Sequence, residues 1–458
     1  MKATGDPSAV MRMRKTLAAS GLAVLIGTLA ATTVIRLGSN LILTRLLAPE
    51  AFGVIGVLSS ITVILQLFTD MGFGAFVVRV HEKVDKKFLN VIWTIRLTRN
   101  AALTAIMFAS ADLLAAGFAK PELATPIRAA SFLFLVEGLI SLHPMMAVRA
   151  RRVSYTSAVD FAAFLIQLAA TIAAAAILRS FWGILIGMYV FTLTKAVFSY
   201  ALYPGGLHRL AFDRKISQDF WNFARLVVVS SIITIILGQA DRVFIGRALS
   251  LEILGLYMLA VNFTSAARQL IEAYTNKIVF PLFAETFRQA PEKLDALFYS
   301  ARRRMTLALA FLLGGGIGGG QLIIRILLDE RYLDAGLYLS ILCLGPLFLL
   351  YRKPAESLMF AKGRIRSTLE SNIVRLIWIA LAAPLGYYYF GVIGLVFAFA
   401  LLEAAAAAYW VVKLKQAGIL NIREELYILG AAGAGAAIGF GADRLAAELI
   451  ASGVLPSF

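Results

Sequence analysis

Apolar runs of about 18 or more consecutive residues recur along the whole of this chain, and as helices they can each cross a hydrocarbon layer about 30 Å thick. The runs are continuous rather than alternating in period two, which argues against a transmembrane β-barrel. The composition agrees, because 60% of the 458 residues are hydrophobic and only 16% are charged. We therefore predict an all-α polytopic membrane protein.

The runs predict twelve spanning helices and a weaker thirteenth. The twelve lie at about 16–43, 51–78, 92–118, 128–148, 157–178, 183–203, 221–246, 252–280, 306–328, 335–360, 368–389 and 391–412. The weaker segment is 426–442, and the stretch after it is too short and polar to predict a fourteenth. The longest interruption, 204–220, contains Pro-Gly-Gly and basic residues, and we interpret it as a cytoplasmic hinge between two halves.

The basic residues behind the net charge of +17 are unevenly distributed among the predicted loops. With the N-terminus in the cytoplasm, Lys and Arg concentrate in alternate loops, which is the positive-inside pattern of membrane proteins. This pattern makes nucleic-acid binding the weaker interpretation. The N-terminal run has no clear cleavage site, so we expect a retained first helix. The one cysteine and three scattered histidines predict no disulfide, no metal site and no cofactor.

A short pattern occurs twice, 202 positions apart: Arg45, Glu50 and Gly53 recur as Arg247, Glu252 and Gly255. We expect Pro49 and Ser250 to open the helices that follow, and the two glycines to allow close packing just beyond. The same shift maps 16–43 onto 221–246 and 51–78 onto 252–280. It predicts two six-helix lobes related as parallel repeats. The predicted domains are 1–208, 209–415 and an extra C-terminal segment, 416–458.

Polar residues recur four positions apart on three predicted spans, which places them on one face of each helix. The three stripes are Thr28, Thr32, Arg36 and Asn40; Thr62, Gln66 and Asp70; and Thr264, Arg268, Glu272 and Asn276, with Lys277 beside the last. A charged side chain at the bilayer centre costs at least about 2.5 kcal/mol. We therefore predict that these stripes face one another or an aqueous cavity.

A simpler interpretation applies to hydroxyl-bearing residues, which often bond one membrane helix to its neighbour at about 0.6 kcal/mol per bond. We favour it for Thr28, Thr32, Thr62, Ser230 and Thr234. Arg268 and Glu272 lie four residues apart, so an ion pair along one helix and a role in a cavity are both open. Glu403 and Arg36 are similarly open between a lining role and a structural one.

Further charged residues lie inside predicted spans: Glu137, Lys195, Arg225, Asp241 and Arg375. Lys195 is the most informative, because it lies too far from either end of its span to reach the interface easily. Several of these cations look unpaired, which suggests an anionic cargo. The candidate substrate-binding residues are Arg36, Lys195, Arg225, Arg268, Lys277 and Arg375. The candidates for coupling an ion or forming ion pairs are Asp70, Glu137, Asp241 and Glu272.

Three other motifs have structural interpretations. The run GGGIGGG at 314–320 lies inside a predicted helix and lacks a following Lys-Ser/Thr, so close helix packing or a bend is favoured over a phosphate loop. His143-Pro144 predicts a proline bend. The cluster YYYF at 387–390 predicts an aromatic belt at a membrane interface.

Residues 39–79, which begin SNLILTRLLAPEAFGVIG, their echo at 238–285, and the segments 143–161 and 181–204 carry a family resemblance. Through them the chain resembles the polysaccharide transporter family (Wzx-type lipid-linked oligosaccharide flippases) of the multidrug/oligosaccharidyl-lipid/polysaccharide exporter superfamily. The resemblance covers about 16–415 and implies that the two six-helix lobes surround a central cavity. It implies a non-enzymatic transporter of the bacterial cytoplasmic membrane that flips polyprenyl-pyrophosphate-linked oligosaccharide by alternating access. It also implies coupling to a proton or sodium gradient, and polysaccharide polymerase or export machinery as partners.

Other functions are weighed against this one. A multidrug antiporter of the same superfamily typically carries cations and predicts an acidic cavity, whereas bases here match or outnumber acids within the spans. A membrane enzyme acting on the same lipid carrier would need a larger outer loop than any predicted here. A scaffold for a biosynthetic complex is a further alternative.

Overall fold

The computed structural model describes residues 27, 31–32, 34–69, 72–79, 84–364 and 366–452. Over these residues the chain is helical and contains no β-strand. Seven of the described helices are long and apolar enough to cross a membrane, or nine if each of two bent helix pairs forms one span. The prediction of an all-α polytopic membrane protein is confirmed.

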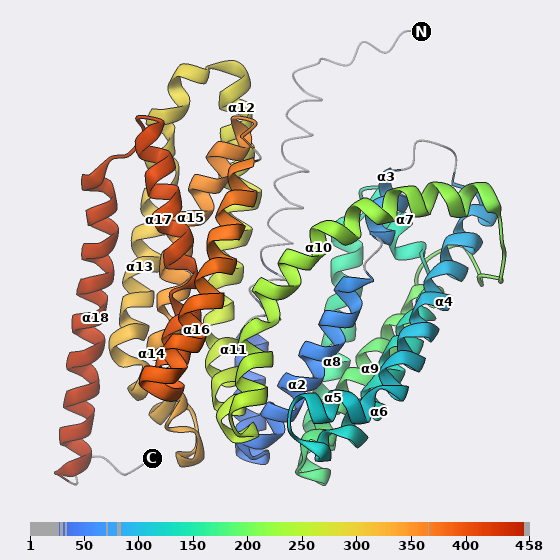
Figure 1. Ribbon diagram of the computed structural model, residues 1–458, viewed down its shortest axis with the longest axis horizontal. Coiled ribbons are helices and arrows are strands. Elements are labelled where there is room, and N and C mark those ends of the chain that lie inside the picture. The colour runs from blue at the N-terminus through green and yellow to red at the C-terminus, as the bar shows by residue number, and fades with distance from the viewer. Residues whose placement is uncertain are drawn as a thin grey trace. The chain divides into compact units, whose positions relative to one another are not determined.

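The chain divides into two compact units (Figure 1). Unit 1 comprises Met1–Leu47 and Val57–Ile235, and unit 2 comprises Ala48–Gly56 and Ile236–Phe458. Helices α2 and α10 each contribute residues to both units. The predicted domain limits, the repeat relation and the central cavity stay predictions.

The elements before the division include a helical segment over 34–46. The others are α2 (Pro49–Phe68), α3 (Phe73–Arg79), α4 (Lys86–Ala109), α5 (Ala111–Gly117), η1 (Pro121–Leu123), α6 (Ala124–Gly138), α7 (His143–Arg149), α8 (Val153–Leu178), α9 (Phe181–Ala201) and α10 (Arg214–Ala248). Those that follow are α11 (Leu251–Tyr274), η2 (Thr275–Val279), α12 (Phe280–Gln289), η3 (Pro291–Lys293), α13 (Leu294–Leu327), η4 (Glu330–Tyr332), α14 (Ala335–Leu342), α15 (Leu344–Ala361), α16 (Arg366–Ala400), α17 (Leu402–Gln416) and α18 (Ile422–Ala451).

Several predicted spans are broken helices. The span predicted over 51–78 ends at Phe68 and resumes at Phe73, after Gly72 with its positive φ of 64°. The one predicted over 92–118 bends by 61° between α4 and α5. The one predicted over 128–148 bends by 56° just before His143-Pro144, and Pro144 lies in the first turn of α7. The predicted bend at His143-Pro144 is therefore confirmed.

Two predicted spans meet inside α16. Gly391 has a φ of 59°, which residues with a side chain rarely adopt, and it separates the predicted spans 368–389 and 391–412. The chain doubles back closely here, because a Cβ on Gly394 would lie 2.1 Å from the carbonyl oxygen of Gly386. Glycine is thus required at both the turn and the close approach that follows it.

A glycine seam joins α13 to α18; it consists of Gly314 and Gly318 on α13 with Gly435 and Gly439 on α18. Figure 1 shows the two helices side by side, with α18 in red. A Cβ on Gly314 would lie 2.0 Å from the carbonyl oxygen of Ala432, so a side chain would force the helices apart. The predicted packing role of GGGIGGG is confirmed. The weak thirteenth segment is also a helix, and α18 is longer than the predicted 426–442.

The twice-occurring pattern forms a helix crossing within unit 2. Pro49 begins α2, and the Ser250 hydroxyl caps α11 by accepting the Ile253 N–H at 3.2 Å. A Cβ on Gly53 would lie 1.9 Å from the Leu251 carbonyl oxygen, and one on Gly255 would lie 1.8 Å from that of Pro49. The predicted close packing is therefore reciprocal, each glycine meeting the start of the other helix.

The segment between α9 and α10 is fixed to unit 1 by hydrogen bonds. His208 Nε2 accepts the Leu142 N–H at 3.2 Å, and the Ala211 N–H donates to Thr94 Oγ1 at 3.0 Å. Burial, with His143 as a second cause, lowers the pKa of His208 to about 4. Helix α10 begins at Arg214, so the interruption is shorter than the predicted hinge over 204–220. The division between the units falls farther along, inside α10.

Each unit has its own apolar core. In unit 1, Phe76, Trp93 and Phe220 belong to one buried cluster that joins α3, α4 and α10. In unit 2, Phe298 and Trp410 belong to another, which joins α12, α13, α15 and α17. The polar groupings described next lie inside single units.

Candidate functional site

Unit 1 contains a cavity of about 780 Å³, called here the unit 1 cavity. Its wall comes from the segment 34–46 and from α2, α6, α8 and α9. The charged and amide-bearing lining residues are Arg36, Asn40, Gln66, Glu137, Asp160, Gln167 and Lys195. The described residues of two predicted stripes, those that contain Arg36 and Gln66, thus face a cavity. Thr28 and Asp70 lie outside the described residues.

Lys195 is paired, contrary to the expectation from its isolated place in an apolar span. Its Nζ lies 3.0 Å from Asp160 Oδ1, which joins α9 to α8. The Asp160 side chain is 56% exposed, and the lysine ammonium also lies 5.4 Å from the centre of the Phe191 ring. The pair therefore borders open space in the cavity.

Glu137 has partners on two other helices. Gln66 Nε2 donates to Glu137 Oε2 at 2.6 Å, and Arg96 Nη2 lies 4.0 Å from Glu137 Oε1. Glu137, Asp160 and Lys195 also line a smaller cavity of about 260 Å³ that includes Arg96. The same charged residues thus border both cavities.

Among the hydroxyl-bearing residues, Thr62 differs from the favoured interpretation. Thr62 Oγ1 donates to the Leu58 carbonyl at 2.7 Å, four residues back on its own helix. The interhelical bond expected of Thr62 is therefore wrong, because the hydroxyl is satisfied locally. The side chains of Ser230 and Thr234 lie outside the described part of the chain.

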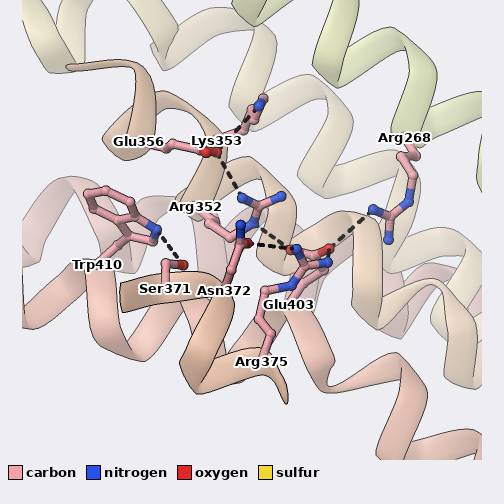
Figure 2. A network of polar contacts seen from close by, with 9 residues as sticks. All are labelled: Arg268, Arg352, Lys353, Glu356, Ser371, Asn372, Arg375, Glu403 and Trp410. Carbon is pink, nitrogen blue, oxygen red and sulfur yellow. Dashed lines mark hydrogen bonds and ion pairs between the residues drawn. The ribbon is translucent and has the colours of Figure 1, made fainter. Parts of the chain in front are cut away.

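A second grouping, called here the Glu403 cluster, lies in unit 2 (Figure 2). The Glu403 side chain on α17 is only 1% exposed. It accepts from Arg352 Nε at 2.5 Å, from Arg375 Nη2 at 2.9 Å and from Arg268 Nη1 at 3.1 Å. Three guanidinium groups from α15, α16 and α11 thus surround one buried carboxylate.

Further charges extend the Glu403 cluster. Glu356 Oε2 accepts from Arg352 Nη1 at 2.8 Å and from Lys353 Nζ at 3.3 Å. These ion pairs bring together four cations and two carboxylates, all labelled in Figure 2. Glu272 is a third acid, close enough to act electrostatically on Arg352. With Glu272 counted, the cluster carries one surplus positive charge.

Arg268 is the open member of the cluster. Its side chain is 39% exposed, whereas those of Arg352 and Arg375 are largely buried. Arg268 pairs with Glu403 rather than with Glu272, the partner four residues away that the sequence suggested. Helix α11 thus presents a guanidinium that is held at one side and accessible at the other.

The structure separates the other predicted residues from these two groupings. Arg225 is exposed on α10, and Lys277 lies in η2; within the described residues neither lines the unit 1 cavity nor joins the Glu403 cluster. Asp241 Oδ2 accepts the Tyr257 hydroxyl at 2.8 Å. The predicted set therefore falls into two assemblies and several isolated positions.

Sequence reasoning missed Asp160, Arg352, Lys353 and Glu356, and left the role of Glu403 open. One signal for three of them was available, since Arg352, Lys353 and Glu356 interrupt the apolar run 335–360. Asp160 lies near the start of its span, where a charged residue is unremarkable in sequence. Its importance comes only from the position of Lys195 across the cavity wall.

Three proteins of polysaccharide synthesis or transport are similar in sequence to this chain. A relative from Bacillus subtilis (strain 168), teichuronic acid biosynthesis protein TuaB, is 21% identical over 304 residues, 66% of this chain and 62% of the relative. Lipopolysaccharide biosynthesis protein WzxC of Escherichia coli (strain K12) is 22% identical over 386 residues, 82% of this chain and 77% of the relative. Succinoglycan biosynthesis transport protein ExoT of Rhizobium meliloti (strain 1021) is 25% identical over 280 residues, 60% of this chain and 55% of the relative. The match to TuaB thus spans about three fifths of that protein's length.

Solved structures show the same fold. Lipid II flippase MurJ in an inward closed conformation gives a TM-score of 0.69 at 14% identity, covering 88% of this chain and 90% of MurJ. An inward-facing multidrug resistance MATE transporter of the MOP superfamily gives 0.63 at 14% identity, covering 85% and 95%. A family model described as "polysaccharide biosynthesis protein" matches residues 42–336, more than half of the chain. The chain belongs to this family of polysaccharide biosynthesis proteins, as its resemblance to polysaccharide transporters predicts.

Proposed function

We propose that this chain flips polyprenyl-pyrophosphate-linked oligosaccharide across the bacterial cytoplasmic membrane by alternating access. The family description and the relatives' names, which include a succinoglycan transport protein, support a cargo used in polysaccharide synthesis. The fold shared with a lipid II flippase supports transport rather than catalysis. The N-terminus is proposed to lie in the cytoplasm, with polymerase or export machinery as partners.

The observation that carries the proposal is the surplus positive charge of the Glu403 cluster. A pyrophosphate leaves water only if cations and hydrogen bonds replace its hydration. Arg268 offers a planar guanidinium with an accessible side, and such groups bind phosphate oxygens in pairs. Arg352 and Arg375 are already bound to Glu403, so they would contribute positive electrostatic potential rather than a direct contact with the pyrophosphate. We assign the pyrophosphate to Arg268.

Coupling to a proton or sodium gradient is part of the proposal. Glu403 is a poor candidate for contacting a coupling ion, because three guanidinium groups already surround its buried carboxylate. Glu137 is the better one, since it lines the unit 1 cavity and its described partners are the neutral amide of Gln66 and the more distant Arg96. An ion that bound Glu137 in one conformation and not in the other would bias their populations. No other cofactor is proposed.

The test is transport of labelled lipid-linked oligosaccharide in proteoliposomes, with and without a proton or sodium gradient. We expect Arg268→Ala to slow transport about tenfold or more, as loss of a charged hydrogen bond predicts. Arg268→Lys should retain part of the activity, because lysine keeps the charge but not the fork. Arg288→Ala is the matched control, since it removes an exposed arginine on α12 outside the cluster. Wild-type rates for Arg268→Ala at normal expression would reject Arg268 as the pyrophosphate ligand.

The alternative function is multidrug transport, because the chain shares its fold with a multidrug transporter. A cationic drug needs a surplus of acid, whereas the Glu403 cluster has a surplus of base. Resistance of a sensitised strain that expresses this chain measures the alternative directly. Drug efflux without transport of the lipid-linked glycan would replace the proposed function.

A further inference from the structure

We infer that the unit 1 cavity binds the uncharged, hydroxyl-rich sugars of the cargo, separately from the anionic group assigned to Arg268. The inference rests on the proposed function and deepens it, because it gives one ligand chemistry to each unit. The two sites differ in charge balance, in hydrogen-bonding capacity and in apolar lining. Each difference is visible in the described residues.

The charge balance of the unit 1 cavity disfavours an anion. Arg36 and Lys195 are the cations on its wall, and Glu137 and Asp160 are the acids. Lys195 is already paired with Asp160, and the guanidinium of Arg36 lies 5.8 Å from the centre of the Phe164 ring. The residues that line this cavity therefore carry polar groups in quantity but no net charge, in contrast to the Glu403 cluster; Arg96, 4.0 Å from Glu137, lines the smaller cavity rather than this one.

Hydrogen-bonding groups on this wall are left available. Gln167 lines the cavity, and no partner of its side-chain amide is seen among the described residues. Asn40 is 7% exposed, and its Nδ2 likewise has no acceptor there. Asp160 is 56% exposed and keeps lone pairs beyond the one used by Lys195. Amide donors beside carboxylate acceptors match sugar hydroxyls, which both donate and accept.

Aromatic rings form part of the remaining wall, beside aliphatic side chains. Phe161 and Phe164 are neighbours with ring centres 6.4 Å apart, and Phe134 and Phe191 also line the cavity. A pyranose has apolar C–H faces as well as hydroxyl edges, so it suits a wall that mixes phenyl rings with amides. The volume of about 780 Å³ is typical of sites that enclose a small organic ligand.

The experiment measures binding of two probes to the full-length protein in nanodiscs. One probe is polyprenyl pyrophosphate without sugar, and the other is the lipid-linked oligosaccharide extracted from the native host. The variants are Gln167→Leu, which removes the available amide at similar volume, and Ser157→Ala, a smaller change on the same wall. Gln289→Leu is the matched control, because Gln289 is exposed on α12 outside the cavity.

We expect both cavity variants to bind the glycosylated lipid about threefold to tenfold more weakly, as loss of a neutral hydrogen bond predicts. Binding of the sugar-free lipid should not change, and Gln289→Leu should match wild type with both probes. Equal losses with both probes would overturn the inference in favour of a lipid or pyrophosphate site. Unchanged binding of both would also overturn it. If wild type transports the glycosylated lipid while either result holds, the proposed function stands and only the sugar site is rejected.

Discussion

Replacing Glu403 with glutamine should destabilise unit 2 far more than replacing Arg268, the open arginine beside it. The substitution keeps the shape of the side chain but removes the one carboxylate that Arg268, Arg352 and Arg375 share. The surplus charge of the cluster rises from one to two, with Arg352 and Glu403 both nearly inaccessible to water. Removing one partner of a buried ion pair costs about 3–5 kcal/mol. That is a large part of the about 5–15 kcal/mol that typically stabilises a folded protein.

The assay is the temperature at which half of the detergent-purified protein loses its monodisperse state, measured by size-exclusion chromatography after heating. Glu285→Gln is the matched control, since Glu285 is exposed on α12, and its loss should change little. Arg268→Ala should be mild, because its partly exposed pair is worth about 1 kcal/mol or less. A Glu403→Gln protein as heat-resistant as wild type would refute the reasoning. So would an Arg268→Ala protein destabilised to the same extent.

Three further predictions follow from other parts of the structure. Gly435→Val should separate α18 from α13 and strongly lower the same heat resistance, because a Cβ at Gly435 would lie 2.0 Å from the Phe311 carbonyl oxygen. Gly433→Val is its control, since a Cβ there meets nothing within 4 Å. Equal effects of the two variants would contradict the glycine seam. The pKa of His208 is about 4 while the segment 202–213 is docked, whereas an ordinary histidine has a pKa of 6.5. Between these two pH values the released segment therefore binds more protons than the docked one. Docking of the segment should therefore weaken as pH falls from about 6.5 toward about 4 and be unaffected by pH above that range. Hydrogen exchange of residues 202–213 measures the docking. A pH profile that His208→Gln leaves unchanged would contradict the role of His208. Asp160→Asn should lower transport while changing stability by less than about 1 kcal/mol, because its pair with Lys195 is half exposed; a heat-labile variant would show that the pair is structural.

Features that depend on local sequence could be predicted. The spans follow from runs of apolar residues, and their division at Gly391 follows from a glycine between two such runs. The close approach of α13 follows from small residues spaced along one helix. The bend at His143-Pro144 needs only the proline. In each case the cause lies within a few residues of the effect.

The polar groupings could not be predicted in the same way. The partners of Glu403 lie 28, 51 and 135 positions away, on three other helices. Whether Arg268 meets Glu272 on its own helix or Glu403 on another is decided by how α11 and α17 pack. Lys195 likewise looked unpaired, because Asp160 lies on a different helix. Composition indicated that such charges must have partners, but only the packing shows which ones.

The glycine seam between α13 and α18 also sets an order for assembly during synthesis. Residues 328–421 lie between the two helices, so α13 is made and inserted well before α18 exists. Until α18 is inserted, the small-residue face of α13 lacks the helix that packs against it, and lipid tails fill such a surface poorly. A chain stalled or cut before residue 422 would leave that face open, as incompletely folded proteins leave surfaces open to quality control. Closure of the seam therefore reports that synthesis has continued through α18.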